Sequence, residues 1–340
     1  MFFLTLRKSA LLRENYLMTD LFSSFDKNIF CFDANYIREK FAAIHFINQN
    51  NKILIVDTAT NHSAKRFLNA LHTMNISPES VEWIILTHVH LDHAGGAGLL
   101  MRMCPNARLA VHPRGARHMV NPEKLWASVV SVYGKEEAEK QYGQLIPVDE
   151  SRVVSVGEGE VISFQNRKLQ IFDAPGHADH HIVIFDEESK SFFTGDAFGI
   201  AYPELTNEDG EFIFISSTPT QFEPEKFGKT VKKIMEQKPE SCFLTHFSKI
   251  MDIEKHGYEL LKQLDEYVKI TQQARNSYES QQDQIKKKLF ELLYNKLKKT
   301  NLSISRHEFG NLLSLDLSLN AQGLEYWNNK VTKQVENANK

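Results

Sequence analysis

Over the first 250 residues, short apolar runs alternate with amphipathic stretches, which is the pattern of an α/β protein. Two apolar runs, residues 42–47 and 52–56, flank the polar segment 48–51 and predict a β-hairpin. Helical periodicity follows over residues 63–74, and the short apolar run 81–86 predicts a buried strand. The pattern therefore predicts alternating strands and helices over residues 42–86.

The same alternation continues as far as residue 246. A loop over residues 198–222 interrupts it and is rich in aromatic residues. Around this loop the pattern predicts a strand at 108–112, a helix at 124–143, four short strands between 153 and 194, a helix at 224–237 begun by Pro224, and a strand that ends at His246.

From about residue 253 the strand signals nearly vanish, and residues 254–299 predict two long helices. The second of these helices has one apolar stripe, flanked by lysines, made of Ile285, Leu289, Leu292, Leu293 and Leu297. Such a basic amphipathic helix could lie on an anionic membrane or dock a partner, but packing of the stripe against the core is the favoured interpretation. We expect an N-terminal extension (1–30), a main α/β domain (31–252) and a helical C-terminal region (253–340).

The end of the helical region carries two conflicting signals. Ser305 and Glu308 match a capping box, which predicts that a further helix starts there. The alternating leucines that follow are typical of a strand instead, and they are Leu313, Leu315, Leu317 and Leu319. The sequence alone leaves both structures open.

Composition is that of an ordinary soluble enzyme. The 340 residues include 40 basic and 43 acidic side chains. The resulting net charge of −3 lacks the excess of positive charge that is typical of proteins that bind nucleic acids. Cys31, Cys104 and Cys242 lack metal-site or disulfide spacing, which favours reduced thiols in a cytoplasmic protein. No run approaches the ~18 apolar residues of a membrane span, and the first residues do not resemble a signal peptide. Translation could start at Met1 or at Met18.

Four side chains that bind metals lie within six residues, immediately after the predicted strand 81–86. The run is His88-Val89-His90-Leu91-Asp92-His93, followed by Gly95 and Gly96. Imidazole and carboxylate groups are ligands for a divalent ion such as zinc. Side chains two apart in an extended segment share a face, so His88 and His90 can hold one ion, while Asp92 and His93 can hold a second.

Three further ligand-type residues each follow a short apolar strand: His177, Asp196 and His246. With these residues the chain resembles the metallo-β-lactamase superfamily over roughly residues 40–250, in the branch that includes glyoxalase II, acyl-homoserine lactonases and tRNase Z. The resemblance implies a four-layer αββα sandwich as the catalytic domain. It also implies two divalent ions per chain, with zinc favoured and iron or manganese possible. The first ion would be held by His88, His90 and His177, the second by Asp92, His93 and His246, and Asp196 would bridge them.

Two such ions would lower the pKa of a shared water from near 15.7 towards about 7. Asp92 and Asp196 are the expected catalytic residues, and Asp92 could also take up the proton when an intermediate collapses. Asp57 could orient a ligand histidine or cap a helix. Other candidates with structural alternatives are His112, His118, Asp179, His180 and His181.

The loop over residues 198–222 bears on the substrate. Its aromatic residues and scarcity of lysine and arginine favour an apolar-walled pocket for an ester, thioester or lactone, that is, a small acyl substrate. Tyr202 is a candidate hydrogen-bond donor to the substrate oxyanion, with simple packing as the alternative, and Phe222 is a candidate pocket wall. A homodimer is possible.

Other activities of the same fold remain open at this point. A phosphodiesterase or nuclease would need basic residues near the ligands, where only Arg114, Arg117 and Lys249 are candidates. Diiron members replace the second histidine of the motif by glutamate, and this chain has His90. A mononuclear iron dioxygenase of persulfides has a similar ligand set. A non-catalytic scaffold would predict a broken ligand set, whereas all seven positions are filled.

Overall fold

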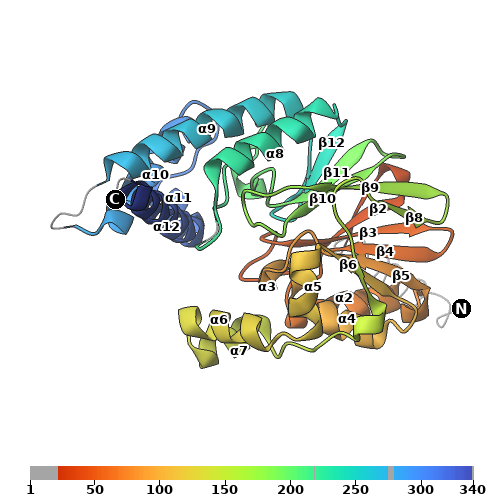
Figure 1. Ribbon diagram of the computed structural model, residues 1–340. Coiled ribbons are helices and arrows are strands. Elements are labelled where there is room, and N and C mark those ends of the chain that lie inside the picture. The colour runs from red at the N-terminus through yellow and green to blue at the C-terminus, as the bar shows by residue number, and fades with distance from the viewer. Residues whose placement is uncertain (1–21, 218, 275–278, 339–340) are drawn as a thin grey trace, which may run out of the picture. The chain divides into compact units, whose positions relative to one another are not determined.

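The computed structural model describes residues 22–338 except for residue 218 and residues 275–278. The question of Met1 or Met18 as the start lies outside the described residues. The chain divides into two compact units (Figure 1). Of the described residues, the first unit comprises those up to Ile171 together with Ile184–Ser189, and the second comprises Phe172–Val183 and those from Lys190 onward.

A seven-stranded sheet forms the centre of the first unit. Its strands lie in the order of the sequence and are β1 (Phe22–Phe25), β2 (Ile29–Asp33), β3 (Ala43–Gln49), β4 (Lys52–Val56), β5 (Val81–Ile85), β6 (Arg108–Val111) and β7 (Val153–Ser155). Strands β1 to β4 pair antiparallel, and β4 to β7 pair parallel. The predicted hairpin is confirmed as β3–β4. Strand β1 and the first residues of β2 lie before residue 31, so the extension predicted over residues 1–30 overlaps this sheet.

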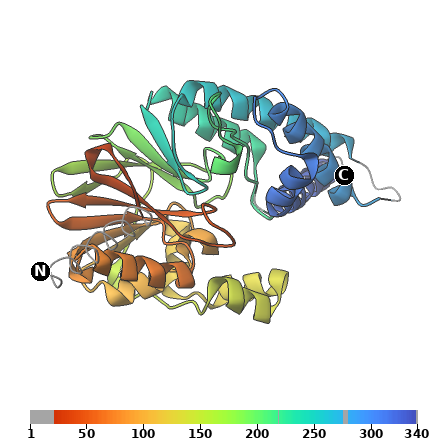
Figure 2. The ribbon, with the colours of Figure 1, turned by 180° about the vertical axis from the view of Figure 1, so that it is seen from behind.

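Parallel strands need crossover connections, and the helices of the first unit supply them. These helices are α2 (Asn61–Thr73), α3 (Leu91–Ala94), α4 (Ala97–Met103), α5 (Pro113–Val120), α6 (Glu123–Tyr133) and α7 (Lys135–Tyr142). Figure 2 shows α2 and α4 beside the strands of this sheet. The single helix predicted at 124–143 is instead two helices, because Gly134 between them has a left-handed φ of 78° that a helix cannot continue through.

A second sheet has the order β13-β12-β11-β10-β9-β8. Its strands are β8 (Val161–Phe164), β9 (Arg167–Asp173), β10 (Ile182–Asp186), β11 (Ser191–Gly195), β12 (Ser241–Leu244) and β13 (Ser248–Ile250). Five strands, β7 to β11, lie where the pattern predicted four, because a turn at residues 157–160 separates β7 from β8. Short 3₁₀ helices lie at Asp26–Asn28, Pro78–Ser80, Glu150–Arg152 and Pro203–Leu205.

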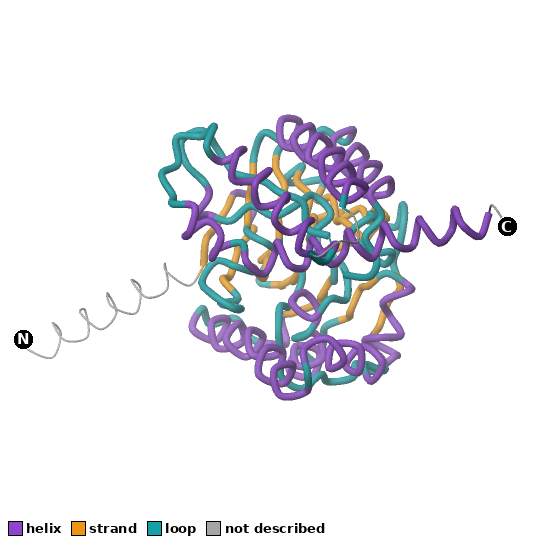
Figure 3. The backbone as a smooth tube through the Cα atoms, turned by 90° about the vertical axis from the view of Figure 1, so that its left-hand side faces the viewer, coloured by secondary structure: helices purple, strands orange, loops and turns teal. Residues whose placement is uncertain are grey.

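Helices dominate the second unit. They are α8 (Pro224–Glu236), α9 (Ile253–Gln273), α10 (Gln281–Leu297), α11 (Arg306–Leu312) and α12 (Ser314–Ala338). Helix α8 begins at Pro224 as predicted, and α9 begins at the residue where the sequence pattern changes. Helices α8 and α9 lie side by side (Figure 1), and the last turns of α12 extend to the end marked C in Figure 3.

Four of the five residues in the apolar stripe of α10 are buried within this unit, and Leu292 is half-buried. Ile285, Leu289, Leu293 and Leu297 are each at most 1% exposed, and α10 packs against α12. Packing against the core is therefore the correct interpretation of the stripe. The capping box at Ser305 and Glu308 is present and starts α11.

Leu315, Leu317 and Leu319 lie in α12, and Leu313 is the C-cap residue of α11, so a strand there is the wrong alternative. Leu313 and Leu317 are buried one turn apart. Among the described residues, Cys31, Cys104 and Cys242 are buried and form no disulfide, and burial raises the pKa of Cys104 to about 12. Among the helices that the structure describes, none has both the length and the apolar character needed to cross a membrane.

Candidate metal centre

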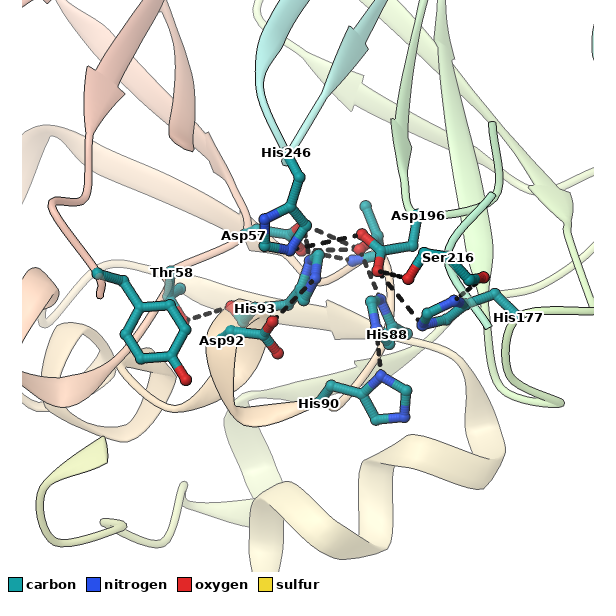
Figure 4. Close-up of polar contacts among 12 residues, drawn as sticks. Asp57, Thr58, His88, His90, Asp92, His93, His177, Asp196, Ser216 and His246 are labelled. Atoms are coloured by element: carbon teal, nitrogen blue, oxygen red, sulfur yellow. Dashed lines mark hydrogen bonds and ion pairs between the residues drawn. The ribbon is translucent and has the colours of Figure 1, made fainter. Parts of the chain in front are cut away.

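The histidine-rich motif lies where strand β5 gives way to helix α3 in the first unit. The apolar strand ends at Ile85, and His90 is the N-cap of α3, with an extended ψ of 149°. Asp92 and His93 consequently fall in the first turn of that helix. His88 and His93 are completely buried, whereas His90 and Asp92 are half-buried. The change from strand to helix turns all four side chains towards one region (Figure 4).

The nitrogen and oxygen atoms of these four side chains lie close together. His88 Nε2 is 2.7 Å from His90 Nδ1, and the rings of His88 and His93 have centroids 4.0 Å apart. Asp92 Oδ2 is 4.0 Å from His93 Nε2. These distances bring the four side chains together, and the pairing of His88 with His90 and of Asp92 with His93 stays a prediction.

Asp57, at the end of β4, holds this motif in place (Figure 4). Its buried carboxylate accepts hydrogen bonds from the Thr87 amide at 2.8 Å and from His93 Nδ1 at 2.8 Å. Because Nδ1 of His93 donates this bond, Nε2 carries the lone pair through which a histidine can bind a metal ion. Thr60 rather than Asp57 caps α2, since its side chain accepts a hydrogen bond from the Ser63 amide. Asp57 is therefore an orienting residue.

The other three ligand candidates belong to the second unit and follow three different strands. Strands β11 and β12 are parallel, with Gly195 in register with Leu244. Their carboxyl ends therefore meet at the same edge of the sheet, and this places Asp196 beside His246. His177 lies in the loop that follows β9. All three side chains are almost fully buried.

The carboxylate of Asp196 faces a different histidine with each oxygen. Asp196 Oδ2 is 3.4 Å from His177 Nε2, and Asp196 Oδ1 is 3.8 Å from His246 Nε2 (Figure 4). A carboxylate that is 4% exposed needs a compensating positive charge. A bridging role between two cations would meet that need and would use both oxygens.

Ser216 contacts two of these three side chains, and the sequence analysis missed it. Its hydroxyl donates to Asp196 Oδ2 at 3.2 Å, and its carbonyl lies 3.0 Å from His177 Nδ1 (Figure 4). The second contact orients His177 in the way that Asp57 orients His93. Nothing in the sequence marked Ser216, because the surrounding loop showed only an aromatic composition.

Three polar residues that follow His177, namely Asp179, His180 and His181, differ in burial and in their contacts. His181 is buried, and its Nε2 accepts a hydrogen bond of 3.2 Å from the Asp196 amide, so it helps to orient that ligand. His180 is also buried. Asp179 is half-exposed and forms an ion pair with Lys226 at 2.7 Å, as expected of a solvated loop residue.

Gly176 precedes His177 for a steric reason. Its φ is 135°, and a Cβ atom there would lie 2.3 Å from backbone atoms of Phe227 at the start of α8. Only glycine allows the loop to approach α8 this closely, and the approach fixes the backbone position of His177.

The remaining candidates have contacts of other kinds. Tyr202 is fully buried, and its hydroxyl donates to Asp316 Oδ1 at 3.0 Å. Phe222 is buried beside Phe227, with ring centroids 5.8 Å apart. Their roles towards a substrate stay predictions. His112 caps α5 by accepting a hydrogen bond from the Arg114 amide, and burial together with nearby cations lowers the pKa of His118.

The donor types fit divalent metal ions. Within the described part of the chain, the residues that could hold such ions are His88, His90, Asp92 and His93 in the first unit, and His177, Asp196 and His246 in the second. Imidazole nitrogens with a few carboxylate oxygens suit zinc, and iron and manganese accept the same groups.

Comparison with known proteins agrees with this chemistry. A segment of a metallo-β-lactamase fold-containing protein of Sulfurisphaera tokodaii is 24% identical over 176 residues, which cover 49% of this chain and 61% of that protein. The hydroxyacylglutathione hydrolase of Pectobacterium atrosepticum is 27% identical over 44% of this chain and 43% of its own length. The chain thus spans about half the length of the curated relatives it matches.

The fold has counterparts among solved structures. The crystal structure of an archaeal metallo-β-lactamase superfamily protein from Sulfolobus tokodaii matches 84% of this chain and 93% of that one, with a TM-score of 0.57 and 19% identity. The sandwich fold with its helical C-terminal region is thereby confirmed. The model of the metallo-β-lactamase superfamily matches residues 38–246, which include every ligand candidate, and the chain belongs to that superfamily.

Proposed function

We propose that the chain is a dinuclear metal-dependent hydrolase of carboxylic esters, thioesters or lactones. In this proposal His88, His90 and His177 hold one ion, Asp92, His93 and His246 hold the other, and Asp196 bridges them. The observation that carries the proposal is the buried Asp196 carboxylate, whose two oxygens face different histidines. Family membership supports the assignment, because the matched region contains all seven residues.

When bound, the two ions would supply a water of lowered pKa and would polarise the substrate carbonyl. The protein's own residues fix the geometry for this chemistry. Asp57 holds His93 by its Nδ1 atom, and Ser216 does the same for His177. Asp92 keeps 27% of its side chain exposed, so its carboxylate remains accessible to take up a proton from a reacting group.

The preference for an acyl substrate rests on two observations. One relative is named as a hydrolase of hydroxyacylglutathione, which carries an acyl group. The nearly balanced charge of the chain disfavours a polynucleotide. The aromatic loop gives less support than its composition suggested, because its large side chains pack in the core: Phe198, Tyr202, Phe212, Phe214 and Phe222 are each at most 2% exposed.

Metal analysis followed by a substrate panel tests the proposal. The purified protein should contain close to two divalent ions per chain, and His88→Ala should lower that number. His307 is exposed, so His307→Ala is a matched control that should leave the number of bound ions unchanged. Nitrophenyl esters, thioesters and lactones should be hydrolysed, at rates that change little between ~50 and ~200 mM salt.

Three results would argue against the proposal. One iron per chain with oxidation of a persulfide would identify a dioxygenase. Cleavage of bis-p-nitrophenyl phosphate without turnover of any acyl substrate would identify a phosphodiesterase. A chain that binds no metal and hydrolyses nothing would be a scaffold.

A further inference from the structure

The C-terminal helices hold the segment 213–217 by its backbone. Gln263 on α9 donates a hydrogen bond of 2.9 Å to the Ile213 carbonyl, and Lys296 on α10 donates one of 2.7 Å to the same oxygen. Asn320 on α12 donates to the Ile215 carbonyl at 2.9 Å. Three helices thus supply side-chain donors to one short segment without regular structure.

Asn320 holds this segment on both sides of Ser216. Besides the bond to Ile215, its Oδ1 atom accepts a hydrogen bond of 2.7 Å from the Ser217 amide. The Ser217 hydroxyl lies 3.1 Å from both Oδ1 and the backbone carbonyl of Asn320. Asn320 is 2% exposed, so these bonds form away from water, where a satisfied amide fixes its partners firmly.

The residue held in this way is the one that contacts His177 and Asp196. Ser216 donates to Asp196 through its hydroxyl and accepts from His177 through its carbonyl. The carbonyl of Ile215 and the amide of Ser217 belong to the peptide units on either side of Ser216. By fixing both, Asn320 fixes where the hydroxyl and carbonyl of Ser216 point.

A second side chain of α12 reaches the segment that holds His246. Asp316, one turn before Asn320, accepts the hydrogen bond from the Tyr202 hydroxyl. The neighbouring Ala201 donates from its amide to the His246 carbonyl at 2.7 Å. Within the second unit, helix α12 therefore holds two segments that contact ligand candidates: Ser216 contacts the side chains of His177 and Asp196, and Ala201 contacts the backbone of His246.

We propose that Asn320 is a positioning residue for the metal centre, acting through Ser216 on His177 and Asp196. This inference rests on the proposed function, because it assigns the helical C-terminal region the task of orienting the ligands of that same site. Residues that orient ligands by hydrogen bonding typically change metal affinity 10–100-fold when they are mutated.

The test measures metal affinity by competition with a chelator, using zinc, on the folded full-length protein. Asn320→Ala should lower the affinity for zinc by ~10–100-fold. Leu317→Ala is the matched control, because Leu317 is also buried on α12 and its loss should lower stability without removing the bonds to residues 215 and 217. Its affinity for zinc should stay close to that of the unaltered protein.

Ser216→Ala provides an independent variant in case Asn320→Ala does not fold. It removes the hydroxyl that donates to Asp196 and leaves the carbonyl that faces His177, so a smaller loss of affinity is expected. Unchanged zinc affinity in folded Asn320→Ala, or in Ser216→Ala if the former does not fold, would overturn the inference. Equal losses in Asn320→Ala and Leu317→Ala would overturn it as well. Failure of the unaltered protein to bind two ions would instead contradict the proposed function.

Discussion

The two sets of ligand candidates are built in different ways. In the first unit, four of them lie within six residues at one strand-to-helix junction, and Asp57 at the end of the neighbouring strand orients His93. In the second unit, three ligand candidates come from loops spread over 70 residues of sequence, from His177 to His246. The residue that holds the segment around Ser216 lies still further along the chain, because Asn320 forms hydrogen bonds with the backbone of residues 215 and 217.

The two sets differ in how many elements of the fold are needed to position their side chains. A short motif needs only its own strand, its own helix and one neighbouring carboxylate. A set assembled from distant loops needs the sheet that aligns the strand ends and the helices that fix the loops between them. The second set is therefore expected to be more sensitive to changes far away in the sequence.

Removal of residues 275–340 should have the largest effect. It deletes α10 to α12, including the buried stripe of α10 and both α12 side chains that connect to the second set. Exposure of this apolar surface should give insoluble or strongly destabilised protein, measured as soluble yield and thermal unfolding. Soluble truncated protein with full metal content would show that the second set does not need these helices.

Asp196→Asn should reduce kcat by at least ~10²-fold, the scale of losing a key electrostatic group. The substitution keeps the size of the side chain and removes the charge shared by His177 and His246. Steady-state kinetics with the best acyl substrate and metal analysis of the same sample measure the effect. Normal metal content with near-normal kcat would exclude a bridging role.

Asp92→Asn makes the corresponding change in the first set of ligand candidates. Asp92 belongs to the first set and is proposed to bind one ion and to transfer a proton. Its substitution should also lower kcat by about 10²-fold, with a changed pH profile. An unchanged pH profile would remove the proton-transfer role from Asp92.

Asp57→Asn should have a smaller effect, confined to the first set. The amide can still accept a hydrogen bond, but it lacks the negative charge that favours the Nδ1–H form of His93. A loss of about 10-fold in affinity for the ion proposed to bind His93 is expected. Asp179→Asn, an exposed control in the second unit, should leave both affinities unchanged, and equal behaviour of the two variants would contradict the role of Asp57.

A pH effect is expected from His45 on β3 of the first unit. Burial lowers the pKa of His45 to about 4, although the negative charge of Asp57 raises it in part. In the unfolded chain His45 binds the proton with a pKa near 6.5. The stability that depends on neutral His45 is therefore fully present above that pH, and it decreases as the pH falls towards 4.

The loss should be roughly 2 kcal/mol between pH 7 and pH 5 for the metal-free protein. Urea unfolding at both pH values measures it. His45→Gln should show a smaller difference between the two pH values. An equal difference would mean that other groups control the acid sensitivity of the first unit.

Much of the fold could be predicted from residue patterns. The β3–β4 hairpin, strand β5, the start of α8 at Pro224 and the capping box of α11 all follow local rules of turn, period and cap chemistry. The pattern failed where one residue interrupts a regular period, as Gly134 does between α6 and α7. It also failed at β1 and β2, which are short and are recognisable only by their pairing in the sheet, β1 with β2 and β2 with β3.

The sequence by itself identified the donor groups of the candidate metal centre. The types of the seven ligand candidates, their order and their positions after strands follow from side-chain chemistry and local periodicity. Tertiary structure decided which residues orient them. Asp57, Ser216 and Asn320 act through hydrogen bonds between segments far apart in the chain, and such contacts leave no periodic signal. Only the folded chain could therefore show that Tyr202 bonds to Asp316 and that α12 supports the loop of Ser216.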